Sequence, residues 1–176
     1  MKALKALFIT GVGAVALAGQ IRSATTATTA VSMSLSSFCL MAVTSSAVTL
    51  TVSDPPSPGE IPTNPTNSST YAQYSSTVAA GVTRRLTAAW AVGNAAPTSC
   101  SLLLTATPAS GQGSSAGQIT VSTTAQNIIT GIGGCATGTG ASSGANLAYT
   151  LSIGTMTSLV ANESKASTIT FTLTDS

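Results

Sequence analysis

Histidine is absent from this 176-residue sequence, and charged side chains of either sign are scarce, at 6% of the chain. A Ser-His-Asp triad and most catalytic zinc sites require histidine. Nucleic-acid binding requires clustered Lys and Arg, of which there are six in total. The four acidic residues are too scattered to nominate a general acid–base pair. The composition therefore predicts a non-enzymatic protein with no nucleic-acid partner.

Motifs that would hold a metal or a cofactor are also missing. The three cysteines form no C-x-x-C pair, so we expect no metal site. Residues 131–136 fit G-x-G-x-x-A, the dinucleotide-binding fingerprint, which requires a helix directly after it. The residues that follow are too rich in glycine for a helix, so we read a loop and expect no cofactor.

No apolar run is long enough to cross a bilayer, which needs about 20 residues. The longest run, residues 6–18, follows Lys2 and Lys5 and ends in an A-x-A cleavage pattern. These features predict a signal peptide over residues 1–18, although an uncleaved anchor is the alternative reading. We expect an extracellular or cell-surface protein that spans no membrane after cleavage.

Cleavage would leave a mature chain with no net charge. Its four basic and four acidic residues cancel: Arg22, Arg84, Arg85 and Lys165 against Asp54, Glu60, Glu163 and Asp175. Such a chain has no field that would attract an anionic partner. Neutrality also removes repulsion between copies, so we expect the protein to associate with itself.

Alternation of apolar and small polar residues is the dominant pattern of the rest of the chain, and it predicts strands with one buried face. The expected strands cover residues 31–35, 48–52, 71–78, 86–92, 102–106, 119–121, 147–153 and 169–173. Pro-rich and Gly-rich segments separate them, notably residues 54–59, 109–117 and 131–144. Seven or eight short strands predict an all-β, immunoglobulin-like antiparallel β-sandwich over residues 37–176, with a closed barrel as the alternative.

The cysteines allow one disulfide with one thiol left over. We expect Cys100 to pair with Cys135, because neither occupies an obvious core position and an exported chain can form disulfides. Cys39 lies between Phe38 and Leu40 and reads as a buried apolar thiol. The alternative is that Cys39 pairs with another subunit.

Two further features have competing interpretations. Tyr71, Tyr74 and Trp90 could form a stacking platform for a sugar, although Trp90 alternates with Leu86 and so fits a core position. Arg84 and Arg85 form an isolated basic pair, which we interpret as a solvated strand end.

Three segments, residues 122–133, 147–153 and 168–175, resemble small secreted bacterial β-sandwich proteins. More broadly, the chain resembles pilus or fimbrial subunits. The resemblance implies that an N-terminal strand of one subunit completes the sandwich of the next. The matching segment is residues 19–36, with a strand at 28–36 and Val31, Met33 and Leu35 as its plugs. It further implies that the partners are copies of the same chain, in a structural surface filament. The alternatives are that the chain keeps this strand in its own sandwich, or that it is a secreted adhesive module that binds surface glycans.

Overall fold

The computed structural model describes residues 26–45 and 47–176, so the signal peptide expected at residues 1–18 lies outside the described residues. The chain divides into two units, Met1–Ser34 and Leu35–Ser176. Residues 26–34 of the first unit are extended and form no strand. The strand expected at residues 31–35 is therefore not a strand in this structure.

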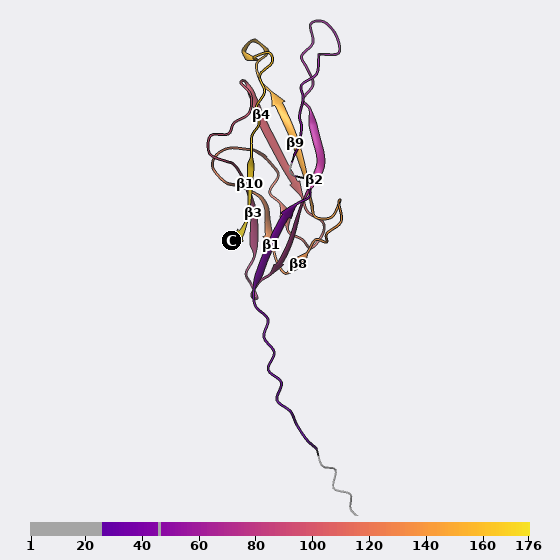
Figure 1. Cartoon of the computed structure of the whole chain (residues 1–176), viewed down its shortest axis with the longest axis vertical. Helices are drawn as coiled ribbons and strands as arrows, with labels where there is room; N and C mark the ends of the chain where they lie inside the picture. Colours follow the sequence, from indigo (N-terminus) through magenta and orange to yellow (C-terminus); the bar gives the residue numbers. More distant parts are fainter. Residues whose placement is uncertain (1–25, 46) are drawn as a thin grey trace, which may run out of the picture. The chain divides into compact units, whose positions relative to one another are not determined.

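The described residues of the second unit are all-β, with ten strands and one 3-10 turn at Met156–Ser158, which confirms the expected class (Figure 1). Sheet A has the order β1-β2-β9-β4-β6, and β8 also pairs with β2. Its strands are β1 Phe38–Val43, β2 Thr66–Thr77, β4 Cys100–Thr107, β6 Gln118–Thr120, β8 Cys135–Ala136 and β9 Ala145–Ile153. Sheet B has the order β10-β3-β7-β5. Its strands are β3 Arg84–Trp90, β5 Ser114–Ser115, β7 Gln126–Ile132 and β10 Ile169–Asp175.

Side chains of both sheets share one core, and all strand pairs are antiparallel. Alternate residues of each long strand point inward, because side chains in a strand alternate between its two faces. Leu86 and Ile129 of sheet B and Leu104 and Leu147 of sheet A are completely buried. The two sheets remain separate in the described part of the chain, which excludes the closed barrel.

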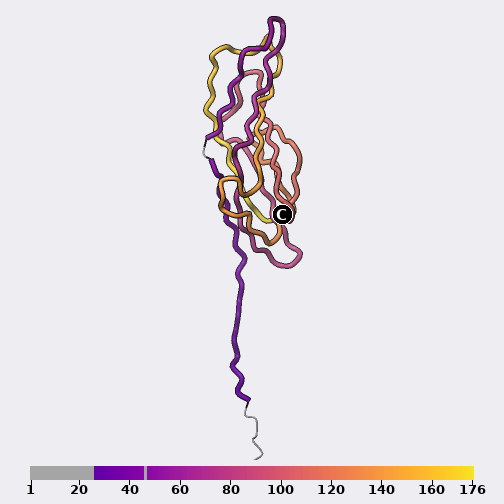
Figure 2. Tube along the Cα trace, turned by 90° about the vertical axis from the view of Figure 1, so that its right-hand side faces the viewer, coloured from indigo at the N-terminus to yellow at the C-terminus, as the bar shows by residue number. Residues whose placement is uncertain are grey.

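Segments at one end of this unit are long loops. The connection from β1 to β2 runs to the top of the β-unit in both views, while β10 ends in the lower part (Figures 1 and 2). Residues 47–52 lie within this connection. Val48 and Leu50 pack against the core as their alternation predicts, yet the segment pairs with no strand. The expected strand at 48–52 is therefore wrong, and the chain uses β1 instead.

Candidate functional site

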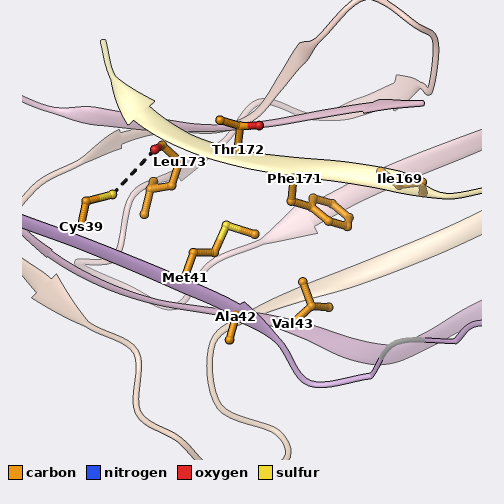
Figure 3. Close-up of a pocket in the computed structure, with 8 residues that line it drawn as sticks. All are labelled: Cys39, Met41, Ala42, Val43, Ile169, Phe171, Thr172 and Leu173. Carbon is orange, nitrogen blue, oxygen red and sulfur yellow. Dashed lines mark hydrogen bonds between the residues drawn. The ribbon is translucent and has the colours of Figure 1, made fainter. Parts of the chain in front are cut away.

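An apolar groove separates β1, an edge strand of sheet A, from β10, an edge strand of sheet B. It encloses about 420 Å³, and six of its lining residues are Cys39, Met41, Val43, Ile169, Phe171 and Leu173. Figure 3 shows Met41 and Val43 pointing from β1 toward β10, with Phe171 and Leu173 pointing back toward them. These four side chains are only partly buried, although they pack against the core. The core is therefore open to the outside along this side.

The backbone of β1 has a free edge along the groove. Thr44 N–H donates to Tyr71 O on β2 at 2.9 Å. Backbone groups alternate between the two sides of a strand, so Ala42 and Leu40 also face β2. The N–H and C=O groups of Cys39, Met41 and Val43 consequently face away from β2. The same three residues thus present both their side chains and their free backbone groups to the groove.

The backbone of β10 has a matching free edge. Ala91 N–H donates to Thr168 O at 2.9 Å, and Ser176 N–H donates to Thr83 O at 3.0 Å. By the same alternation, the backbone groups of Ile169, Phe171 and Leu173 face away from β3. The Cys39 thiol lies 3.7 Å from Leu173 O, which places that carbonyl on the groove side (Figure 3).

Neither edge carries the usual protection against strand addition. Natural edge strands are commonly short, or carry charged residues or proline. β1 has six residues with neither, and β10 carries no proline and no charge before Asp175. On the opposite side of the unit, β6 and β5 have three and two residues. There the chain passes from sheet B to sheet A at Gly117, whose φ of +89° favours glycine. One side is thus covered by this crossing segment, whereas the side at β1 and β10 is open.

Arg84 lies beyond the Cys39 end of the groove, where it is buried against Phe38 and Asp175, so the expected solvated strand end is wrong for this residue. Its side chain is 7% exposed, while Arg85 is exposed. The guanidinium donates to Asp175 Oδ1 at 2.8 Å, Phe38 O at 2.6 Å and Ser37 Oγ at 2.9 Å. It also donates to Ser76 Oγ at 3.0 Å and Thr77 O at 3.2 Å. A buried cation needs such partners, and these tie β1, β2, β3 and β10 together.

The expected plug residues are large apolar side chains that residues 26–36 leave exposed. Val31, Met33 and Leu35 are 69%, 89% and 81% exposed. Residues 26–36 carry no charge, and their apolar residues alternate with serine from Val31 onward. An exposed alternating apolar row lacks the buried face that its pattern predicts.

The expected disulfide is not formed, and all three cysteines are free thiols. Cys100 lies opposite Ile153 at one end of the β4–β9 ladder, whereas Cys135 lies opposite Ser76 on β2. Measured along the paired strands of sheet A, Cys100 and Cys135 lie roughly 40 Å apart, at about 3.3 Å per residue. This separation is far beyond the Cα distance of about 7 Å that a disulfide can bridge. Burial raises the thiol pKa of both residues. Cys39, expected to be buried, is exposed beside the groove.

The aromatic platform is also wrong. Tyr74 is 3% exposed, and its hydroxyl donates to Gln112 O at 2.6 Å. Tyr71 lies an odd number of residues away on the same strand, so its ring points to the opposite face of sheet A. Trp90 packs against the core, as its alternation predicts. The three rings therefore form no shared surface for a sugar.

Within residues 26–45 and 47–176, no three His, Cys, Asp or Glu side chains gather as a metal site would require. No helix in the same described part is long and apolar enough to cross a membrane. No protein-family model, curated protein or solved structure matches this chain. The groove between β1 and β10 is accordingly the feature on which a functional proposal can be built.

Proposed function

We propose that this chain is a non-enzymatic extracellular structural protein, a subunit of a surface filament assembled by β-strand complementation. Residues 28–36 of one copy form the donated strand, and Val31, Met33 and Leu35 enter the groove of the next copy. The immunoglobulin-like sandwich belongs to this proposal, with the donated strand as its missing element. The observation that carries it is the open apolar groove between two unprotected strand edges.

The spacing of the plugs suits the groove. Three alternate residues of an extended strand span about 13 Å. Three alternate residues of β1, Cys39, Met41 and Val43, line the groove. Three alternate residues of β10, Ile169, Phe171 and Leu173, line it from the other side. A strand with three apolar residues on one face therefore meets three inward residues on each side. Its backbone can bond to the free groups of either edge, which is the usual mode of strand addition.

The separation of donor segment and groove also supports a filament. The donor segment and the groove are different surfaces, so each contact is head-to-tail. Such contacts generate open filaments when the rotation between copies does not close a ring. The absence of net charge in the mature chain removes repulsion between successive copies.

Electron microscopy and light scattering of the purified exported protein test this proposal. We expect regular filaments from the full chain and monomers from a variant that lacks residues 19–35. A synthetic peptide of residues 26–37 should bind the truncated monomer and raise its Tm, because it fills the groove. Small monodisperse particles from the full chain would overturn the proposal.

A matched pair of substitutions separates plug chemistry from charge. Met33→Asp places a carboxylate on the groove face, where burial of an unpaired charge is costly, and should abolish filaments. Ser34→Asp adds the same charge on the other face of the same strand and should leave filaments intact. Equal effects of the two variants would contradict the plug assignment.

A further inference from the structure

We propose that the groove is filled only by another copy, because the chain's own N-terminal segment cannot place its plugs there. This inference rests on the proposed function and names the occupant of the same groove. Residues 28–36 lead directly into β1, so folding back along the free edge of β1 would be the nearest way to fill the groove. Three features oppose it.

Strand parity is the first feature. The tightest common hairpin has a two-residue loop, here Ser36 and Ser37, and it sets Leu35 opposite Phe38. Residues directly opposite one another point to the same face of a sheet. Phe38 lies one residue from Cys39, so its side chain is on the other face from the groove. A shift of one residue moves every side chain of a strand to the other face, and all three plugs would point outward.

Turn chemistry is the second feature. Keeping all three plugs in the strand and on the groove face, without inserted residues, needs a three-residue loop made of Ser36, Ser37 and Phe38. Such loops place a residue in the left-handed region, which strongly favours glycine. Residues 26–45 contain no Gly, Asn, Asp or Pro. The sequence therefore offers no residue at this junction that favours the left-handed region.

The third feature is that the same residues are held in place. Ser37 Oγ donates to Thr77 O at 2.9 Å and accepts from Arg84 Nη2 at 2.9 Å. Phe38 pairs with Thr77, and its carbonyl accepts from Arg84 Nη1 at 2.6 Å. A three-residue loop would remove Phe38 from this ladder and leave the buried guanidinium with unmet donors, which is costly. These contacts hold Ser37 and Phe38 in an extended conformation, so the two residues are not available to form a turn.

A single inserted glycine between Leu35 and Ser36 tests the inference in the full exported chain. The Gly-Ser36 pair then suits a type II′ turn, with Leu35 opposite Ser37, whose backbone groups face the free edge of β1 as those of Cys39 do. Met33 and Val31 come opposite Cys39 and Met41, and all three plugs lie on the groove face. Because short flexible links give effective concentrations in the millimolar range, self-filling should outcompete donation at micromolar concentrations by about 100-fold or more.

An alanine inserted at the same place is the matched control, since it changes length and parity equally but disfavours positive φ. We expect stable monomers with a protected Cys39 thiol from the glycine insertion, and filaments from the alanine insertion. Filaments that persist undiminished in both variants, or disappear equally in both, would overturn the inference.

Alkylation of the Cys39 thiol distinguishes failure of this inference from failure of the proposed function. If the unmodified chain forms no filament, the proposed function fails by itself. Rapid alkylation of Cys39 in that monomer would still support an unfilled groove. Protection of Cys39 in the monomer, reversed when residues 19–35 are removed, would show self-filling and overturn the inference.

Discussion

The Arg84 guanidinium lies 2.8 Å from the Asp175 carboxylate, in an ion pair whose two side chains are 7% and 70% exposed. The two residues face each other across the β3–β10 ladder. Arg84 also donates to the start of β1 and the end of β2, so one side chain joins both sheets beyond the Cys39 end of the groove. The pair is unequal, because the cation is buried while its carboxylate partner faces water.

This asymmetry predicts different costs for the two partners. Arg84→Met removes the hydrogen bonds that the guanidinium donates to Asp175 and to the ends of β1 and β2, and we expect a loss of about 3 kcal/mol in unfolding free energy. Asp175→Asn removes only an exposed charge and should cost about 0–1 kcal/mol. Urea unfolding of a variant lacking residues 19–35, which avoids filaments, measures both values. Equal losses would contradict the anchoring role of Arg84.

The cysteines should behave as three free thiols. Cys39 is exposed, whereas burial raises the thiol pKa of Cys135 and, with help from Glu163, that of Cys100. In the variant that lacks residues 19–35, whose groove is empty, we therefore expect iodoacetamide to alkylate Cys39 first and the other two more slowly, since the thiolate is the reactive form. Peptide mapping under non-reducing conditions measures the order. A peptide that links Cys100 to Cys135 would contradict the register of sheet A.

Alkaline pH should destabilise the fold through its buried tyrosines. Burial raises the pKa of Tyr149 to about 12, from 10.0. Because the folded-state pKa is the higher one, this stabilisation is complete below pH 10 and is lost as pH rises toward 12. Unfolding midpoints from pH 8 to 12 should fall mainly in that window. Tyr149→Phe should flatten the fall, and an unchanged profile would contradict the cause.

Glu163 should make one loop contact sensitive to acid. Its carboxylate accepts from Thr98 N–H at 2.7 Å, and this bond, followed by Lys165, lowers its pKa. Stabilisation of this contact is therefore present at neutral pH and is lost as pH falls through the lowered pKa. The protection factor of the Thr98 amide, which compares its exchange rate with that of an unstructured chain at the same pH, should fall in acid. Glu163→Ala, which has no side-chain acceptor, should show low protection of this amide at both pH values, and protection that survives in this variant would contradict the contact.

Clean alternation made several strands predictable from the sequence. The expected ranges 102–106, 147–153 and 169–173 fall inside β4, β9 and β10. β1 was missed because Phe38–Val43 is a continuous apolar run without alternation. Residues 48–52 show the opposite case: they alternate, but they form no strand. Alternation predicts that one face is buried, and it does not predict whether another strand lies alongside to form hydrogen bonds.

The candidate site was only partly predictable. The plugs could be proposed from their period, but the groove depends on which strands become edges, and that is a property of the whole topology. The role of Arg84 was hidden for the same reason, because its carboxylate partner is 91 positions away. Pairing of Cys100 with Cys135 likewise depended on a register that the local sequence does not contain.

The central claim is that the plugs of one copy lie in the groove of another, and native Cys39 reports this directly. Leu35→Cys and Val31→Cys, each in a background with Cys100→Ser and Cys135→Ser, place a thiol at one end of the plug row. One of the two new thiols should come within disulfide reach of Cys39. Which one does so depends on whether the donated strand runs parallel or antiparallel to β1. Ser34→Cys on the opposite face is the control. We predict a ladder of covalent multimers on a non-reducing gel from one plug variant and none from the control. No ladder from either plug, or an equal ladder from Ser34→Cys, would contradict strand complementation.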